Sequence, residues 1–140
     1  TWVPDAQGAE PFWLTSDYFP QIRAHDHTIF PSADRFATML TPHLGAGGSI
    51  RMSPVPIPHD CVDGFLCAYW RRPECYLEPD RRAAISSFAR FDAEPGLARL
   101  RQDLRSGAWV KRNRHILDLD ALDVGYRLVT VELGTTRTGP

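Results

Sequence analysis

The chain has 140 residues, of which 43% are hydrophobic and 24% charged, and its formal net charge is −1. These values predict one soluble globular domain with a sizeable apolar core. There is no run of about 18 apolar residues, and the first residues lack the basic start and apolar stretch of a signal peptide. We therefore expect a cytoplasmic protein with no membrane partner.

Charge and cysteine content exclude two further classes of function. Residues 1–70 carry three arginines against seven acids, and residues 71–140 carry thirteen basic residues against ten acids. This imbalance is too small, and the charges too interleaved, for the basic footprint of a nucleic-acid partner. The three cysteines (Cys61, Cys67 and Cys75) are an odd number without a CxxC pair. They predict reduced, buried thiols rather than a disulfide framework or a structural zinc site.

The first third of the chain predicts a strand end followed by helices. Thr1–Pro4 has the pattern of a strand running into a loop, and it looks cut because no initiator methionine precedes it. Large apolar residues fill 12–22, but Pro20 limits any helix there to one or two turns unless it lies in the first turn. Ser32 is a favourable N-cap for a helix that ends near Gly45, with apolar residues at Phe36, Met39 and Leu40.

The middle of the chain predicts a strand and then an amphipathic helix. Residues 49–53 alternate as a strand does, whereas the prolines that follow cannot donate hydrogen bonds to a sheet. From residue 62 to residue 70, apolar side chains recur at i, i+3, i+4, i+7 and i+8, namely at Val62, Phe65, Leu66, Tyr69 and Trp70. This spacing is the clearest helix pattern in the chain. Asp60 stands where the N-cap of that helix belongs.

The last part predicts helices and a closing strand. Asp80 can cap a helix through Ala89, Pro95 suits the first turn of another, and residues 109–117 favour a short helix. The β-branched stretch 126–133 predicts a strand, and 134–140 a flexible tail. The order of these predicted elements indicates an α/β fold with few strands, in one domain at 1–133. So small a sheet has an open edge, and we expect a partner chain or a second copy to complete it.

Several stretches together resemble the C-terminal half of a class I S-adenosylmethionine-dependent methyltransferase of the small-molecule, type 11-like sort. They are TWVPD (1–5), FWLTSDYFPQI (12–22), VPIPHDCVDGFLCAYWRRPECYLEPDRRAAISSFA (55–89), GLARLRQDLRSGAW (96–109) and DLDALDVGYRLVTVEL (118–133). The resemblance implies a Rossmann-like sheet. In it, residues 1–5 end the fourth strand, 49–57 form the fifth, and 126–133 form one of the last two.

The resemblance also implies the cofactor S-adenosylmethionine and a small-molecule methyl acceptor. The family's glycine-rich loop after its first strand, and the acidic residue that ends its second strand, have no counterpart in this sequence. The glycine cluster at 45–48 follows a helix and precedes a strand, the reverse of the setting in which a glycine loop offers amides to a ligand. It is interpreted as a helix stop, so the chain alone lacks the main cofactor-binding half.

On this mapping the acceptor-side residues follow the strand ends, where ligands bind in open α/β sheets. His59 is the candidate base because its ordinary pKa is near neutrality, and Asp60 adjoins it as a second candidate catalytic residue. The candidate substrate-binding residues are Trp2, Asp5, Tyr18 and Trp70. No metal site is expected, since three adjacent residues such as 59–61 do not converge on one ion.

Each candidate also has a structural interpretation. Asp60 is a helix cap, His59 closes a loop, and Cys61 is a small first-turn residue. Tyr18 and Trp70 are more often core residues than substrate contacts. His25, Asp26 and His27 are expected in a solvated turn.

Three hypotheses for the function remain. The first is the acceptor-side portion of a small-molecule methyltransferase, inactive alone because the cofactor loop is absent. The second is a non-catalytic binding module derived from such a portion. The third, a hydrolase with Cys61 as nucleophile, is weak because a cysteine nucleophile usually draws its base from a distant part of the chain.

Overall fold

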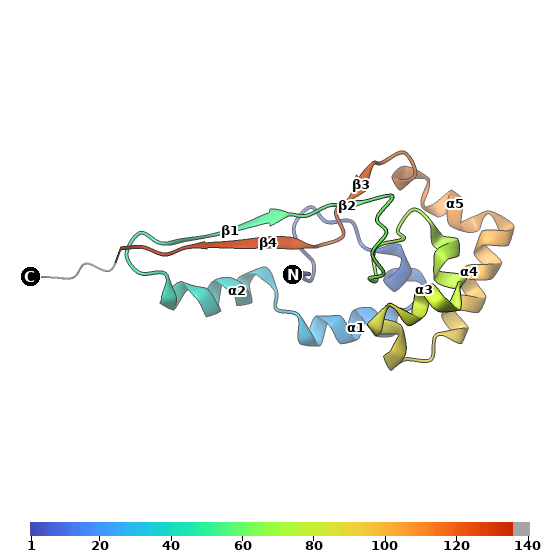
Figure 1. The fold of residues 1–140 in the computed structure, drawn as a ribbon, viewed down its shortest axis with the longest axis horizontal. Coiled ribbons are helices and arrows are strands. Elements are labelled where there is room, and N and C mark those ends of the chain that lie inside the picture. Colours follow the sequence, from blue (N-terminus) through green and yellow to red (C-terminus); the bar gives the residue numbers. More distant parts are fainter. Residues whose placement is uncertain (136–140) are drawn as a thin grey trace, which may run out of the picture.

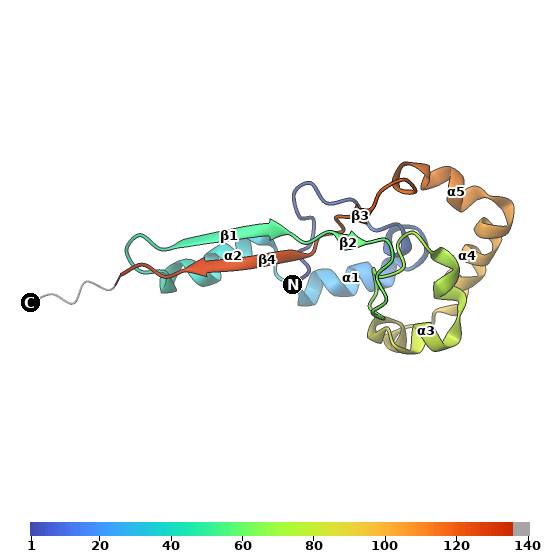
Figure 2. The ribbon, with the colours of Figure 1, turned by 45° about the horizontal axis from the view of Figure 1, so that its top comes forward.

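The protein consists of a helical body and a long arm that extends from it (Figure 1). The computed structural model describes residues 1–135, so the predicted flexible tail lies outside the described residues from residue 136 on. The arm comprises residues 33–54 and 127–134, and the remaining described residues form the body. Figure 2 shows the arm's helix lying alongside its two strands.

The α/β composition expected from the sequence is confirmed. The helices are α1 (Pro20–Ile29), α2 (Ala33–Leu40), α3 (Pro79–Ala83), α4 (Glu94–Ser106) and α5 (Ala108–Arg112). The strands are β1 (Ser49–Pro54), β2 (Ile57–Pro58), β3 (Ala121–Leu122) and β4 (Arg127–Glu132). A π-helical turn spans Leu14–Tyr18, and short 3-10 helices span Thr41–His43, Pro73–Leu77, Ser86–Arg90 and Arg114–Ile116.

The described strands pair in antiparallel fashion. Strand β1 pairs with β4, with Ser49 opposite Glu132, and β2 pairs with β3. Near the start of β4, the Tyr126 carbonyl accepts a hydrogen bond from the Val55 amide at 2.9 Å. On its other side the same segment pairs antiparallel with Trp2. The segment that ends after Trp2 and strand β1 therefore run in the same direction, but the β4 segment lies between them.

Helix boundaries follow the capping and proline signals in three places. In α2 the Ser32 hydroxyl accepts a hydrogen bond from the Arg35 amide at 3.3 Å, as the N-cap prediction requires. Pro20 lies in the first turn of α1, where its missing N–H is harmless, so α1 continues to Ile29. Helix α4 likewise has a proline in its first turn, and it ends at Ser106 before the C-cap Gly107, whose φ is 75°.

The predicted amphipathic helix after Cys61 is wrong. Residues 61–72 form successive turns, because side chains occupy the backbone groups that a helix would pair internally. The Tyr69 amide donates to the Tyr76 hydroxyl at 3.2 Å, and this hydroxyl donates to the Leu66 carbonyl at 2.7 Å. The guanidinium of Arg72 donates to two further carbonyls in the segment. Asp60 therefore caps no helix.

Two other predicted helices are shorter than expected. The helix expected from Asp80 to Ala89 ends at Ala83 and is replaced by the 3-10 helix that begins at Ser86. The expected helix at 109–117 divides at Asn113 into α5 and a 3-10 turn. The largest apolar residues of the two segments, Ile85 and Phe88 in the first and Trp109 and Ile116 in the second, are still buried, whereas Ala84 and Ala89 are exposed. The spacing therefore indicated the burial of the large side chains but not the backbone conformation that buries them.

The core of the body is aromatic, and the indole N–H groups of Trp13 and Trp70 are paired there, whereas the buried indole N–H of Trp109 has no partner among the described residues. The Trp13 indole N–H donates to the Trp70 carbonyl at 2.8 Å, and the Trp70 indole N–H donates to the Ile57 carbonyl at 2.9 Å. The Trp13 ring also makes edge-to-face contacts with Tyr76 and Trp109. Buried indoles with satisfied N–H groups stabilise a core without the penalty of an unpaired donor.

Candidate functional site

A cavity of about 410 Å³ lies in the body, and parts of the chain far apart in sequence form its walls. Helix α1, the turns at 64–67, the segment 84–87 and the N-terminal strand end all contribute. Its apolar wall includes Trp2, Phe12, Phe30, Phe65, Leu66 and Ile85, and its polar groups include Thr15, Arg23, Asp26, Cys67 and Tyr126. An apolar cavity of this size with a few polar groups has the character of a small-molecule site.

Asp26 supplies a carboxylate to this cavity. It lies in α1, is half-buried, and its side chain forms no hydrogen bond or ion pair with any residue in 1–135. Burial raises the pKa of Asp26 above its ordinary value, and the neighbouring His25 and His27 oppose that rise. A titratable group whose pKa is shifted by burial in a cavity is a candidate functional group.

Tyr126 and Cys67 place two neutral donors in the same cavity. Burial raises the pKa of both the Tyr126 hydroxyl and the Cys67 thiol, and the two groups interact with each other. The negative charge of the nearby Asp26 carboxylate raises the pKa of both groups further. At neutral pH the hydroxyl and the thiol therefore keep their protons.

Asp5, a predicted substrate-binding residue, forms an ion pair with Arg23, the cationic side chain that lines the cavity. Its carboxylate pairs with the Arg23 guanidinium at 3.1 Å and lies 3.8 Å from the imidazole Nδ1 of His27. Asp5 lines two neighbouring cavities but not the 410 Å³ cavity, so it reaches that cavity through Arg23.

Trp2, the second predicted substrate-binding residue, does line the cavity. Its indole N–H donates to the Val124 carbonyl at 2.8 Å, which holds the ring in place. The ring meets Phe30 edge to face with the ring centroids 5.7 Å apart. Gly125 fits closely beside it, because a Cβ there would lie 2.9 Å from the Trp2 indole nitrogen and φ is 100°.

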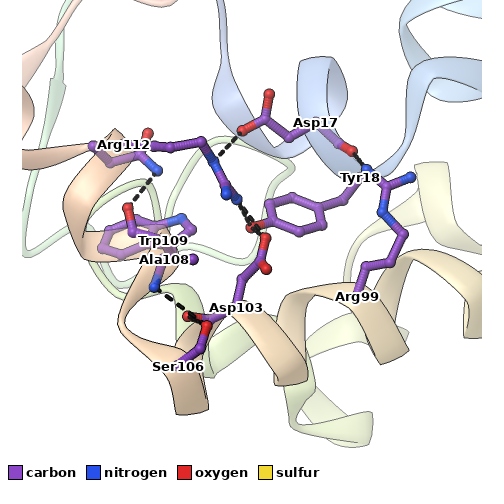
Figure 3. A network of polar contacts seen from close by, with 9 residues as sticks. Asp17, Tyr18, Arg99, Asp103, Ser106, Ala108, Trp109 and Arg112 are labelled. Atoms are coloured by element: carbon purple, nitrogen blue, oxygen red, sulfur yellow. Dashed lines mark hydrogen bonds and ion pairs between the residues drawn. The ribbon is translucent and has the colours of Figure 1, made fainter.

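Tyr18 lies away from this cavity, in a polar network between the N-terminal turn and α4 and α5 (Figure 3). Its hydroxyl donates to the Asp103 carboxylate at 2.7 Å and accepts from the Arg112 guanidinium at 2.5 Å. Arg112 also pairs with Asp103 and, at 3.4 Å, with Asp17. These contacts lower the pKa of Asp103, with Arg112 the larger cause and Tyr18 the second. The network joins three elements of the body.

Trp70, His59 and Asp60 also lie outside the cavity lining. Trp70 is fully buried in the core, at 0% exposure. His59 is half-buried, and its backbone amide donates to the Asp120 carbonyl at 2.9 Å, so it continues the β2–β3 pairing. Asp60 is exposed in a turn. The structure thus brings His59 and Asp60 to neither Trp2 nor Asp26, and their catalytic role stays a prediction.

The cavity's polar residues were absent from the sequence-based site. The expected solvated turn at 25–27 is wrong, because these residues continue α1 beyond Pro20. A signal was present: Ile22, Asp26 and Phe30 follow at i, i+4 and i+8, so a helix through them places all three on one face. The two other polar residues of the cavity discussed above, Cys67 and Tyr126, come from distant parts of the sequence and meet only in the folded chain.

Neither the cysteines nor the metal-binding residue types form a second candidate site in the part of the chain that the structure describes. Cys61, Cys67 and Cys75 form no disulfide, and the last two are buried as expected, whereas Cys61 is half-buried. Among residues 1–135, no three His, Cys, Asp or Glu side chains are arranged to hold a metal ion. Within the same range, no helix has the length and apolar composition needed to cross a membrane.

Residues 1–135 form no glycine-loop cradle of the kind that holds S-adenosylmethionine. The glycine cluster at 45–48 closes the turn between α2's 3-10 extension and β1, as the sequence predicted. Its neighbour Leu44 accepts a hydrogen bond from the Gly134 amide at 2.6 Å, so the chain itself packs against this loop. No strand in residues 1–135 leads through a glycine loop into a helix N-terminus, which is the setting that binds such cofactors.

Comparison with known proteins gives one informative likeness. No protein-family model matches the chain, and no curated protein matches it. A crystal structure of a "Putative methyltransferase from antibiotic biosynthesis pathway" from Anabaena variabilis is 36% identical, with a TM-score of 0.78. The match covers 92% of this chain and 51% of that chain. This chain therefore has the fold of about half of a methyltransferase-like protein.

Proposed function

We propose that this chain is the acceptor-side portion of an S-adenosylmethionine-dependent methyltransferase that acts on a small molecule. The observation that carries the proposal is the likeness to half of the Anabaena protein, with 36% identity over nearly the whole chain. The 410 Å³ cavity supports the proposal, because its size and apolar wall suit a small molecule.

The residues of the cavity can do what an acceptor site requires. S-adenosylmethionine supplies an activated methyl group when bound, so the acceptor site needs chiefly to align the acceptor atom and exclude water. The aromatic wall, including Trp2, Phe30 and Phe65, excludes water around the acceptor. Asp26 can take a proton from the acceptor atom, and the Tyr126 hydroxyl can donate a hydrogen bond to it.

The groups that hold the cofactor are proposed to come from outside residues 1–135, either from another segment of the natural protein or from a second chain. Two observations support this: the described residues lack a glycine cradle, and the chain spans about half the length of the Anabaena protein. The chain alone is then inactive. The arm is the surface proposed to receive that other part, because its apolar residues Met39 and Leu128 are 55% and 61% exposed.

Cofactor titration tests the claim of inactivity. The 140-residue chain is titrated with S-adenosylmethionine in a calorimeter, and we expect no binding at micromolar concentrations. Light scattering of the same sample reports whether a second copy completes the fold. Micromolar cofactor binding by a strictly monomeric chain would contradict the proposal that the cofactor half is supplied from elsewhere.

Reconstitution tests the activity itself. The half of the Anabaena protein that this chain does not match is co-expressed with the chain, and transfer of a labelled methyl group to small acceptors is measured. We expect transfer by the mixture, and its loss with Asp26→Asn but not with Asp118→Asn, an exposed aspartate outside the cavity. A mixture that binds the cofactor but labels no acceptor would favour the second candidate, a non-catalytic binding module. That candidate draws support from the missing cradle.

A further inference from the structure

The charge balance of the 410 Å³ cavity is unusual. Two charged side chains line it, Arg23 and Asp26. Arg23 already has a partner, because Asp5 pairs with it at 3.1 Å. Asp26 has none among residues 1–135, and the two other titratable groups of the lining, Cys67 and Tyr126, are held neutral by burial. The ammonium of Thr1, another residue of the lining, donates to the Arg127 carbonyl and forms no ion pair with Asp26, so the side chains of the cavity present one uncompensated negative charge.

No cation of the described chain neutralises Asp26 from an adjoining element. His25 and His27, the neighbours of Asp26 in α1, partly oppose the rise in its pKa, but neither forms an ion pair with it. Arg90 lines a smaller cavity of about 120 Å³ that shares Asp26, yet it makes no ion pair with this carboxylate. A half-buried carboxylate without a partner is energetically unfavourable, so a ligand that brings a positive charge gains most at this position.

Aromatic rings surround the carboxylate's cavity. Trp2 meets Phe30 edge to face, and Phe65 meets Tyr126 in the same way with centroids 5.6 Å apart. All four rings line the cavity. Ring faces attract cations, and carboxylates combined with aromatic walls are the usual means by which proteins bind organic ammonium groups. The apolar wall in addition favours a ligand body that is itself apolar.

We infer that the cavity binds a small protonated amine with an aromatic or aliphatic body, whose ammonium group pairs with Asp26 and whose body packs on the ring-lined wall. That this amine is the methyl acceptor rests on the proposed function; that it binds does not. An anion is disfavoured because Arg23, the one cationic side chain of the lining among residues 1–135, is already paired with Asp5, and the Thr1 ammonium donates to the Arg127 carbonyl. A neutral molecule would leave the Asp26 carboxylate without its counter-charge.

A binding assay on the intact 140-residue chain tests this inference. Three probes of similar shape are titrated at pH 7: 2-phenylethylamine, which is cationic, 2-phenylethanol, which is neutral, and 3-phenylpropionate, which is anionic. Because Trp2 lines the cavity, quenching of tryptophan fluorescence reports binding, and calorimetry confirms it. We expect the amine to bind about tenfold or more tightly than the alcohol, as charge-assisted hydrogen bonds predict, and the acid not to bind.

Matched variants locate the charge that is responsible. Asp26→Asn should weaken amine binding to the level of the alcohol, whereas Asp118→Asn, the same change at an exposed site, should leave it unchanged. Equal affinity for amine and alcohol in the unmodified chain would overturn the inference, whatever the folding of the variants. Displacement of the amine by S-adenosylmethionine would also overturn it, because the cavity would then be the donor's site.

The outcome separates the two proposals. Amine binding without methyl transfer in the reconstituted mixture would uphold the ligand class and remove the proposed function. Methyl transfer with no preference for amines would uphold the proposed function and remove the ligand class. Neither result depends on the other, since the binding assay uses no methyl donor.

Discussion

The body and the arm differ in how they bury their apolar side chains. The body contains fully buried residues such as Leu14, Trp70 and Leu100. In the arm Arg127, which is polar, is the single residue of the buried class, and Met39 and Leu128 are more than half exposed. A two-stranded ribbon is marginal in water unless a further layer covers it. The body therefore has a buried core of its own, whereas the apolar side chains of the arm are exposed as in a sheet layer that lacks its cover.

The largest predicted effect compares the same substitution in the two regions. Leu100→Ala removes a fully buried side chain in α4 and should lower the free energy of unfolding by about 3 kcal/mol. Leu128→Ala removes a side chain that is 61% exposed in β4, and it should change that free energy by less than about 0.5 kcal/mol. Urea unfolding followed by circular dichroism measures both. Similar losses would show that the arm is covered in solution, and the contrast between the regions would then be wrong.

The second prediction concerns the junction between arm and body. Arg127 is 6% exposed, pairs with Asp123 at 2.7 Å, and donates to the Gln7 carbonyl at 3.0 Å. Arg127→Met leaves the Asp123 carboxylate without its partner and should lower the free energy of unfolding by about 2 kcal/mol. The control is Arg51→Met on the arm. The exposed ion pair between Arg51 and Glu132, 3.8 Å apart, should contribute about 0.5 kcal/mol or less to the free energy of unfolding. Equal effects in urea unfolding would mean that the junction is not a buried anchor.

The same contrast explains what the sequence could predict about the fold. Local signals were sufficient where one residue decides a boundary, as Ser32 does for α2. They failed at 61–72, because the Tyr76 hydroxyl and the Arg72 guanidinium take up backbone groups that a helix would use. Those partners lie outside the helix that the spacing predicts. A periodic pattern thus indicates which residues are buried more reliably than how the backbone buries them.

The candidate site was predictable only in part for a related reason. Trp2 was predicted and lines the cavity, but Asp26 was expected in a solvated turn together with His25 and His27, so its place on α1 was missed. Cys67 and Tyr126 are 59 positions apart and meet across the fold. Residues that become functional through long-range packing carry no local pattern, so the cavity could be found only in the folded chain.

The third prediction uses the network that ties α4 and α5 to the N-terminal turn. Arg112 and Tyr18 lower the pKa of Asp103, so the ionised network stabilises the fold above the ordinary aspartate pKa near 4. This contribution is lost as the pH falls through the lowered value. Asp103→Asn should therefore lower the free energy of unfolding by about 1 kcal/mol at pH 7 and by much less near pH 2.5. Urea unfolding at the two pH values measures the difference, and a loss that is the same at both would contradict the assignment.

The smallest expected effect is at Asp26, where the sign is opposite. Burial raises the pKa of this carboxyl in the folded chain, so its ionised form destabilises the fold at a pH above the raised value. Below the ordinary aspartate pKa the carboxyl is protonated in both states, and the penalty disappears. Asp26→Asn should therefore raise the midpoint of thermal unfolding at pH 7 by about 1 to 3 °C, and change it little near pH 3.

This sign distinguishes a group kept for binding from a group kept for stability. A structural aspartate such as Asp103 has partners in the folded chain, and its replacement weakens the fold. Asp26 lacks such a partner among residues 1–135, so its replacement removes a strain that only a bound cation would relieve. If Asp26→Asn lowered the unfolding midpoint at pH 7, the carboxylate would have a stabilising partner in solution, and the charge balance inferred for the cavity would be wrong.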